Sequence, residues 1–434
     1  MNPPPVTRRR FVHSTGALGA ILALGKPPSV LPAESPGNRV VVGVIGLSRG
    51  MAHVAGHLGV NNVEVGYVCD VDSGRLASGL KTAETKQPTA VRKPQGVGDF
   101  RRILDDKNVD AVSIAMPNFW HTPAAILAMQ AGKHVYVEKP GSHNPWEAEA
   151  IVAASVKYKR KVQMGNQRRS YANVMEGIQK LREGIIGKVL YSRCYYNGAR
   201  PSIKKGQLGQ PPATLNWSLW QGPTPERPYK DNLHPYNWHW HWHYGGGEMA
   251  NNGIHALDVS RWGLGVDYPT KVTFLGGRYH WDDDQETPDT GSAVFDFGHC
   301  GASWDDSSCN PRKGEKGLPF VAFYGNKGTM TMSGGNDYTV TDNDGKEVEK
   351  KSGGPGGGDV PHFTNFSDAI RENKPLNSPI SEGQKGSLMC HLANIAYRTN
   401  SALNIDPKNG HIIGNPEAQK LWKREYRPGW EPKV

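Results

Sequence analysis

The chain has 434 residues and a formal net charge of +10, from 51 Lys and Arg against 41 Asp and Glu. This length predicts two domains rather than one. The basic residues are spread along the chain without a block of about five like charges, so we expect no nucleic-acid surface. No run of about 18 apolar residues occurs, and we expect no membrane span.

The first residues are predicted to be an export signal rather than part of the fold. The stretch TRRRF at 7–11 is basic, and a short run of small apolar residues follows it. A basic region before a short apolar region is typical of secretory signals, and paired arginines are typical of the twin-arginine route. We therefore expect residues 1–33 to be a twin-arginine signal and the protein to be periplasmic.

Strand-like and helix-like segments alternate between residues 38 and 165. The strand-like segments are continuous apolar runs, as expected for strands that are covered on both faces. Such alternation predicts a doubly wound parallel sheet of the Rossmann type. The expected strands are Val40–Ile45, Val63–Cys69, Ala111–Ala115, His134–Val137 and Val162–Met164, and the expected helices are Met51–Leu58, Ser73–Thr85, Phe100–Leu104, Thr122–Ala131 and Pro145–Lys157.

Residues 166–434 have a different pattern, with alternating strands that have one wet face. These strands are Val189–Tyr195, Lys271–Phe274, Gly291–Phe297 and Phe320–Tyr324, and helices are expected at His362–Glu372 and Ser381–Asn400. The pattern predicts an α+β domain with a mostly antiparallel open sheet, and this second domain is where we expect substrate binding and oligomerisation. The fold class is therefore α/β, with a Rossmann domain at 38–165 and this second domain at 166–434.

The turn after the first strand varies the dinucleotide-binding fingerprint. Gly46 can make the tight turn, and Gly50 opens the following helix and permits close approach of a phosphate. Ser48 stands where the middle glycine would be, and its hydroxyl and the charge of Arg49 can contact phosphate. An ordinary strand–turn–helix is the alternative.

An acid at the end of the second strand supports the nucleotide interpretation. Asp70 follows Gly46 by 24 residues. A carboxylate there binds the ribose 2′-hydroxyl and repels a 2′-phosphate. The sequence therefore predicts NAD as cofactor, with NADP as the lesser alternative.

Four motifs follow in order along the chain. They are Asn118-Phe-Trp-His121-Thr-Pro, Glu138-Lys139-Pro140, Gly165-Asn166-Gln167 and Gly245-Gly-Gly-Glu-Met-Ala-Asn251-Asn-Gly-Ile-His255-Ala-Leu-Asp258. Their ordered combination resembles the Gfo/Idh/MocA oxidoreductases, over residues 39–405. The resemblance implies that Glu138 and Lys139 contact the nicotinamide ribose and the substrate. It also implies that Asn118 and His121 lie along the cofactor and that Asn166 closes over it.

Lys139 and His255 are the expected acid–base groups. A lysine at a strand end beside bound substrate is desolvated, which lowers its pKa and suits it to handle a hydroxyl proton. His255 and Asp258 are three apart on a helix and share a face, where the carboxylate can fix the imidazole tautomer. Inositol-type dehydrogenases carry Asp where this chain has Asn251, which cannot accept a proton, so Asn251 is expected to orient a substrate hydroxyl. A surface lysine and a structural histidine are the alternatives.

The stretch Trp238-His-Trp-His-Trp-His243 is the most unusual part of the second domain. If it were extended, the three Trp would face one way and the three His the other. Two interpretations are then equally expected: the tryptophans form one wall of a substrate pocket, or they fill the hydrophobic core. A metal site is not expected, because no carboxylate partner for the histidines is evident. Further expected substrate contacts are Trp220, His234, Tyr236, His243 and His255.

The function predicted from these observations is an exported NAD(P)-dependent oxidoreductase. It would transfer a hydride between a sugar, polyol or glycoside hydroxyl carbon and a tightly held cofactor. One alternative is an NAD-dependent glycosidase of the α-N-acetylgalactosaminidase type, which oxidises a ring hydroxyl, eliminates the glycosidic bond and returns the hydride. A non-catalytic protein that binds cofactor and sugar is the other. We expect a homo-oligomer, either a dimer or a tetramer.

Overall fold

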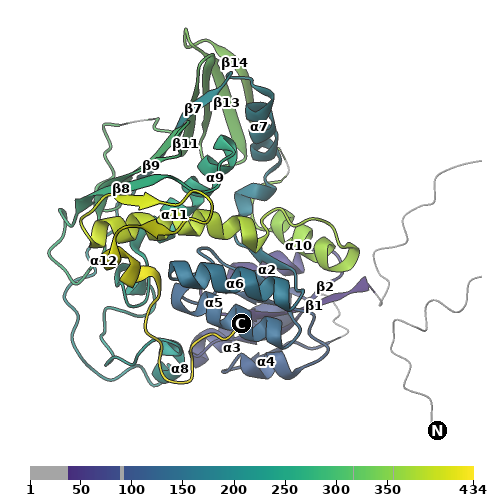
Figure 1. The fold of residues 1–434 in the computed structure, drawn as a ribbon. Coiled ribbons are helices and arrows are strands. Elements are labelled where there is room, and N and C mark those ends of the chain that lie inside the picture. Colours follow the sequence, from purple (N-terminus) through teal and green to yellow (C-terminus); the bar gives the residue numbers. More distant parts are fainter. Residues whose placement is uncertain (1–37, 88–91, 316, 355) are drawn as a thin grey trace, which may run out of the picture.

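A computed structural model describes residues 38–434 except 88–91, 316 and 355, and two β-sheets organise these residues (Figure 1). The proposed export signal at 1–33 lies outside the described residues. None of the described helices is long and apolar enough to cross a bilayer.

The first sheet has six parallel strands in the order β3-β2-β1-β4-β5-β6. This is the strand order of a doubly wound dinucleotide-binding fold. Its strands are β1 Val40–Ile45, β2 Val63–Cys69, β3 Gln95–Val97, β4 Ala111–Ile114, β5 His134–Val137 and β6 Val162–Met164. Its helices are α2 Gly50–Leu58, α3 Ser73–Lys86, α4 Arg101–Asp105, α5 Asn118–Gln130 and α6 Pro145–Lys157. The predicted parallel sheet is confirmed, and the three-residue β3 is the strand that the apolar pattern did not predict.

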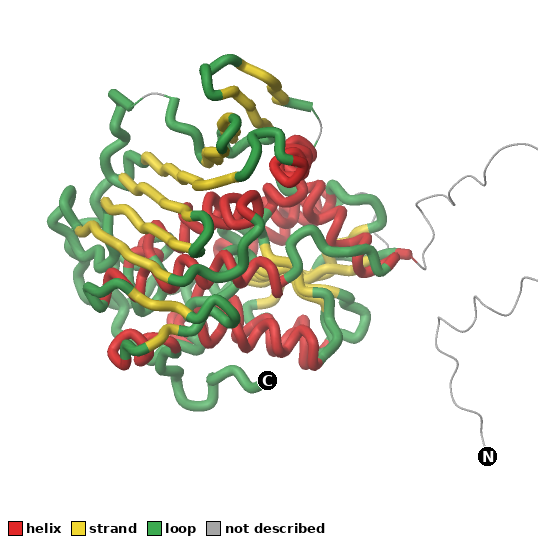
Figure 2. Tube along the Cα trace, turned by 45° about the horizontal axis from the view of Figure 1, so that its top comes forward, coloured by secondary structure: helices red, strands yellow, loops and turns green. Residues whose placement is uncertain are grey.

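The second sheet has ten strands in the order β14-β13-β12-β11-β7-β10-β9-β8-β15-β16. Every neighbouring pair is antiparallel except β7 and β10, which run parallel. The prediction of a mostly antiparallel sheet is therefore confirmed. Its strands are β7 Val189–Asn197, β8 Lys271–Gly277, β9 Thr290–Asp296, β10 Gly301–Ser307, β11 Val321–Gly325, β12 Gly328–Met332, β13 Asp337–Asp342, β14 Glu347–Ser352, β15 Leu403–Ile405 and β16 Ile412–Ile413. Figure 2 shows these strands side by side as a twisted layer with helices behind it.

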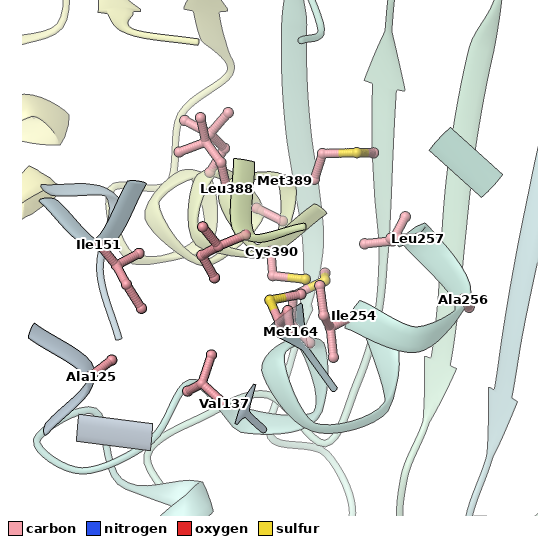
Figure 3. Packing of buried hydrophobic residues seen from close by; sticks show 14 of the residues in the cluster. Ala125, Val137, Ile151, Met164, Ile254, Ala256, Leu257, Leu388, Met389 and Cys390 are labelled. Carbon is pink, nitrogen blue, oxygen red and sulfur yellow. The ribbon is translucent and has the colours of Figure 1, made fainter. Parts of the chain in front are cut away.

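Helix α11 (Ile380–Arg398) joins the two sheets into one core. It contacts α6, α9 (Ile254–Leu264) and β8. Met389 and Cys390 of α11 are buried beside Met164 at the end of β6 and Ile254 of α9 (Figure 3). Because burial of each large apolar side chain contributes about 1.5–3 kcal/mol, this shared core fixes the sheets relative to one another. The remaining helices are α7 Ala172–Glu183, α8 Trp217–Gln221, α10 Val360–Glu372 and α12 Pro416–Gln419.

Helix α10 lies far along the chain but covers the parallel sheet. Phe363 and Phe366 are completely buried with the valines of β1. A Cβ on Gly56 of α2 would lie 2.5 Å from the ring of Phe363, so glycine there permits the close approach of α10. Helix α10 belongs to the second expected domain but packs on the sheet of the first, across the expected domain boundary between residues 165 and 166.

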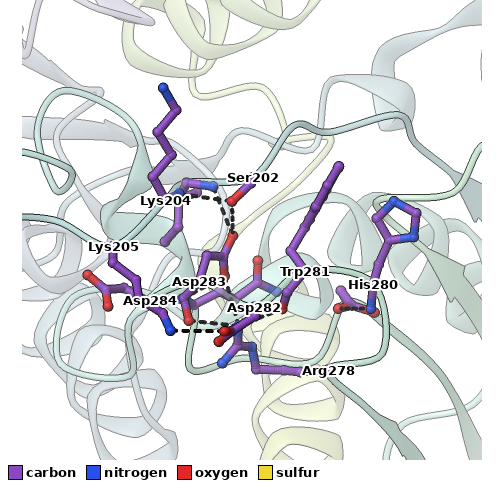
Figure 4. Close-up of polar contacts among 12 residues, drawn as sticks. Ser202, Lys204, Lys205, Arg278, His280, Trp281, Asp282, Asp283 and Asp284 are labelled. Atoms are coloured by element: carbon purple, nitrogen blue, oxygen red, sulfur yellow. Dashed lines mark hydrogen bonds and ion pairs between the residues drawn. The ribbon is translucent and has the colours of Figure 1, made fainter.

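Two long loops of the second domain are tied to each other through Asp283. Its buried carboxylate accepts hydrogen bonds from the Ser202 hydroxyl and the Ile203 amide, both at 2.9 Å, and pairs with Arg278 at 2.8 Å (Figure 4). Paired and hydrogen-bonded in this way, the buried charge is compensated. The Gly- and Pro-rich loop at 201–212 is thereby anchored at one end.

The Trp-His stretch is not extended, so the predicted separation of its two faces is wrong. Asn237–Trp240 forms a short 3-10 helix, and a turn follows. Trp238 is buried, and Trp240 is completely buried beneath the guanidinium of Arg200, which lies 3.8 Å from its ring centroid. Burial of these two side chains agrees with the alternative that the tryptophans fill the core.

Candidate active site

A cleft opens at the carboxyl ends of β1, β2, β4 and β5, where a doubly wound sheet binds its ligands. It brings together most of the predicted site residues. Those that line it are Gly46, Ser48, Arg49, Asp70, Asn118, His121, Glu138, Lys139, Trp220, His234, Tyr236 and Asn251. Gly50, Asn166, His243, His255 and Asp258 are not among the lining residues.

The turn after β1 depends on glycine at position 46. Gly46 has φ +87°, and its amide donates to the Cys69 carbonyl at 2.8 Å. A Cβ there would lie 2.7 Å from the Ala115 carbonyl oxygen. Gly50 begins α2 behind the turn and packs toward Val44, so it shapes the helix start without lining the cleft. Ser48 is exposed on the turn beside this helix N-terminus, where anions are favoured.

Replacing Gly46 by alanine is expected to weaken coenzyme binding at least tenfold and to destabilise the fold by about 1–3 kcal/mol, the range for a non-glycine residue at positive φ. Equilibrium titration with NADH and denaturant unfolding would measure the two effects. Gly98→Ala is the matched control, because Gly98 lines the same cleft and has open space where its Cβ would lie. Equal effects of the two substitutions would contradict this role of Gly46.

Asp70 lies beside this turn at the end of β2. Its two carboxylate oxygens accept hydrogen bonds from the Leu47 amide at 2.7 Å and the Asp72 amide at 2.9 Å. Burial raises the pKa of Asp70, although both hydrogen bonds favour the charged form. The carboxylate thus couples the glycine turn to the position where a ribose would lie.

Glu138 is the centre of a buried charge network. Its carboxylate is 3.0 Å from both His53 and Arg49 and 3.2 Å from Gln167. Burial alone would raise the pKa of Glu138, but its bond to His53 and the nearby positive charges hold that pKa well below the usual value. Arg49 also pairs with Asp359 at 2.7 Å, so its guanidinium is held by two carboxylates rather than free to reach a phosphate.

Lys139 points at Asn251 from the end of β5. Its ammonium is 2.8 Å from the Asn251 carbonyl oxygen and 3.3 Å from the side-chain Oδ1. Burial lowers the pKa of Lys139, as we expected for a lysine at this strand end. Asn251 was expected to orient a substrate hydroxyl. In the structure its carbonyl oxygen and its side-chain oxygen orient the ammonium of Lys139.

Glu248 does not line the cleft but contacts Asn251, which does, and it was not predicted from the sequence. It is 2% exposed, and its carboxyl accepts hydrogen bonds from the side-chain amides of Asn251, at 3.2 Å, and Asn252. Burial raises the pKa of Glu248. A carboxyl group therefore lies one helical turn before Asn251 and is hydrogen-bonded to it.

His255 lies near Lys139 but does not line the cleft. It is half-buried, and burial together with the positive charge of Lys139 lowers its pKa well below the usual value. The low pKa keeps the imidazole in its neutral form and makes it a weaker base than an ordinary histidine.

The predicted role of Asp258 is wrong. Both of its oxygens are bound by Arg169, at 2.8 and 2.9 Å, and both side chains are buried. A carboxylate engaged on both oxygens by a guanidinium is a structural ion pair, so Asp258 does not orient His255.

The expected substrate residues divide between two places. Trp220, His234 and the 49% exposed Tyr236 line the cleft. His243 instead lines a second cavity, where its Nε2 lies 2.9 Å from the Pro225 carbonyl oxygen. His239, which was not among the expected substrate contacts, lines the cleft instead of His243. Burial lowers the pKa of His239 to about 3.

His121 and Asn166 occupy different positions relative to the cleft. The His121 ring lies between the carbonyl oxygens of Met116 and Pro140 and so ties the turn after β4 to the turn after β5. The side-chain amide of Asn166 is buried, and neither of its polar atoms has a partner among the described residues. Asn166 directly follows β6 but does not line the cleft, so its predicted contact with the coenzyme remains a prediction.

The part of the chain that the structure describes contains no group of three His, Cys, Asp or Glu side chains that could hold a metal ion. Two histidines of the Trp-His stretch contact protein groups: Nδ1 of His239 bonds the Tyr236 carbonyl oxygen at 2.6 Å, and His241 lies 3.7 Å from Glu286.

Comparison with known proteins identifies the family. A sequence model described as "Oxidoreductase family, NAD-binding Rossmann fold" matches residues 38–166, and one described as "GFO/IDH/MocA C-terminal domain" matches 196–331. Together they cover more than half of the chain and agree with the two sheets. The chain belongs to the Gfo/Idh/MocA family of oxidoreductases, and its first sheet is an NAD-binding domain.

The curated relatives include glycoside hydrolases. A glycosyl hydrolase family 109 protein of Saccharopolyspora erythraea is 30% identical over 212 residues, which are 44% of this chain and 46% of that protein. An alpha-N-acetylgalactosaminidase of Tannerella forsythia is 27% identical over 220 residues, 46% of each. The chain thus spans about half the length of the curated relatives it matches.

Solved structures share the fold at lower identity. The aldose-aldose oxidoreductase of Caulobacter crescentus, complexed with glycerol, has a TM-score of 0.63 and 19% identity over 85% of this chain and all of that one. The WlbA dehydrogenase of Bordetella pertussis, in complex with NADH and UDP-GlcNAcA, has a TM-score of 0.61 and 18% identity over 85% and 99%.

The cleft fits an NAD molecule on two observations. The Gly46 turn leaves no room for a Cβ, and Asp70 ends β2 at the ribose position. Lys139 and Asn251 lie at the end of β5, away from Asp70 at the end of β2. The nicotinamide end is therefore the end where proton chemistry is available.

Proposed function

We propose that this protein oxidises a hydroxyl-bearing carbon of a sugar, polyol or glycoside with a tightly held NAD. The observation that carries the proposal is the Lys139–Asn251–Glu248 chain of contacts at one end of the NAD-binding cleft. The cleft wall formed by Trp220, Trp238 and Tyr236 supports a carbohydrate, because aromatic rings pack against sugar C–H surfaces while their polar edges meet hydroxyls.

NAD, when bound, accepts a hydride from the carbon that bears the reacting hydroxyl. Lys139 is placed to take the proton of that hydroxyl, since burial lowers its pKa toward the range where an amine can exchange a proton. Asn251 holds Lys139 in position, and Glu248 holds the amide of Asn251. His255 lies near Lys139 but does not line the cleft, and its lowered pKa makes it the weaker candidate for proton transfer.

An NAD-dependent glycosidase of the alpha-N-acetylgalactosaminidase type is the second candidate. The similarity to glycosyl hydrolase family 109 proteins favours it. Such a reaction needs one group for the hydroxyl proton and another for a proton on the sugar ring. Lys139, which lines the cleft, can serve as the first of these groups. His255, which does not line the cleft, would have to reach the ring proton to serve as the second.

The purified protein is first analysed for bound nicotinamide by absorbance and mass spectrometry. It is then incubated with aldoses, polyols and nitrophenyl glycosides, each with and without a second sugar as hydride acceptor. A dehydrogenase yields oxidised sugar with NADH or a reduced second sugar, whereas a glycosidase releases nitrophenol without net NADH. Bound NAD with no turnover of any compound would contradict both and leave the non-catalytic alternative.

Export and oligomer state complete the proposal. A twin-arginine signal at 1–33 suits an enzyme that must acquire its coenzyme in the cytoplasm and then act in the periplasm, because this route carries folded proteins. Association of two or four chains is supported by exposed apolar side chains on the second sheet: Leu275 and Val294 on the neighbouring strands β8 and β9, and Leu190 on β7, which β10 separates from β9.

A further inference from the structure

The last residues of the chain return to the NAD-binding domain. After α12 the chain leaves the second sheet and crosses the outside of the α5 and α8 region (Figure 1). Arg424 pairs with Glu147 at 2.9 Å and donates to the Phe119 carbonyl at 2.7 Å. Near the end of the chain, the carbonyl of Lys433 accepts from Gln130 of α5 at 2.8 Å.

The same segment is also fixed to the loop after α8. The Arg427 amide donates to the Pro223 carbonyl at 3.0 Å, and its guanidinium pairs with Glu226 at 2.7 Å. Residues 424–433 therefore connect the loop after α8 to α5 and α6. We call this segment the clasp.

The clasp contributes one side chain to the cleft, Trp430. Its ring lies 5.4 Å from that of Trp120 in an edge-to-face arrangement, and the guanidinium of Arg101 is 5.5 Å from its centroid. Arg101 is in turn fixed by both carboxylate oxygens of Asp99, and Asp99, Phe100 and Arg101 all line the cleft. An aromatic and cationic wall thus stands on the β2 and β3 side of the cleft.

This wall lies at the adenosine end. Asp70 at the end of β2 marks the adenosine ribose in a doubly wound fold. Gly98–Arg101 follow β3, next to β2 in the sheet, whereas Lys139 and Asn251 lie beyond β5. Trp430 is therefore on the side of the cleft where an adenine base would be placed.

We propose that the clasp retains the coenzyme by holding its adenine against Trp430. This inference rests on the proposed function only in that NAD occupies the cleft. Stacking of a base on an aromatic side chain contributes enough to change affinity by about tenfold to hundredfold. Differences in affinity within one site appear mainly in the dissociation rate, so Trp430 slows coenzyme release. A coenzyme held in this way serves an enzyme that carries out both halves of a redox cycle without exchanging NAD.

The test compares Trp430→Ala with Trp422→Ala. Trp422 is the matched control because it precedes the clasp, packs on His411 and lies outside the cleft. NADH-loaded protein is mixed with excess NAD, and NADH release is followed by fluorescence. We expect Trp430→Ala to release NADH about tenfold to hundredfold faster and Trp422→Ala to release it at the wild-type rate. Trp430→Phe, which keeps a ring, should lie between alanine and wild type.

A second arm separates stacking on adenine from a general loosening of the cleft. ADP-ribose contains the adenosine half of the coenzyme, and reduced nicotinamide mononucleotide lacks it. Trp430→Ala should weaken ADP-ribose and leave the mononucleotide affinity unchanged. An unchanged rate of NADH release from Trp430→Ala, or an equal loss of affinity for the two probes, would overturn the proposal that the clasp holds the adenine. Either result would leave sugar turnover by the wild-type protein intact, whereas failure of the proposed function would appear as absent turnover with normal NADH release.

Discussion

Replacing Lys139 by methionine is expected to lower kcat by roughly 100-fold to 10,000-fold while NAD stays bound. Methionine keeps much of the volume of the side chain but cannot take a proton. The contacts that hold the dinucleotide, the Gly46 turn and Asp70, are unaffected. Single-turnover kinetics on the substrate found in the sugar panel, together with the NAD content of the purified variant, would measure both parts.

Lys230→Met is the control for this experiment. Lys230 is a partly buried lysine that pairs with Asp284 at 2.6 Å and does not line the cleft. We expect its variant to turn over at the wild-type rate. Wild-type turnover by the Lys139 variant would contradict the assignment of Lys139 as the proton-handling residue.

Replacing Asp258 by alanine is expected to lower the free energy of unfolding by about 3–5 kcal/mol. The substitution leaves the Arg169 guanidinium buried without its two bonds, which is the costly way to break a buried ion pair. Denaturant unfolding at equilibrium would measure the loss.

Asp267→Ala provides a matched comparison at an exposed site. Asp267 pairs with Arg261 of α9 at 3.4 Å, but its side chain is 61% exposed, so its loss should cost no more than about 1 kcal/mol. If Asp258→Ala instead kept its stability and lost turnover, Asp258 would be catalytic and the structural assignment would be wrong.

The sequence was sufficient for the parallel sheet and for the base of the cleft. Strands buried on both faces are continuous apolar runs, and three of them, β1, β2 and β5, end at a residue with a visible chemical signal: Gly46, Asp70 and Glu138. β3 gave no such signal, because two of its three residues are exposed and one is glycine. Its position follows from pairing with β2, which is a tertiary contact.

The errors at the site have a common physical cause. Helical spacing places His255 and Asp258 on one face, but it cannot reveal that Arg169, 89 residues earlier in the chain, binds Asp258 first. Alternation of Trp and His describes a strand only if the backbone is extended, and the stretch folds as a turn instead. In both cases, contacts between distant segments overrode a local pattern.

Glu248 and Trp430 were not predicted from the sequence, and they differ in whether a sequence signal existed. Glu248 could have been predicted, because it lies inside the recognised glycine-rich motif and one helical turn before Asn251. Trp430 could not, since nothing local to the end of the chain indicates that it returns to the cleft. Only the hydrogen bonds of Arg424, Arg427 and Lys433 place it there.

A crystal structure of the protein with NAD tests the central claim most directly. We predict the adenosine ribose on the carboxylate of Asp70 and the nicotinamide ring beside Lys139 and Asn251, with open space next to the ring for a sugar carbon. A cleft that excludes the coenzyme, or a nicotinamide ring remote from Lys139, would contradict the account.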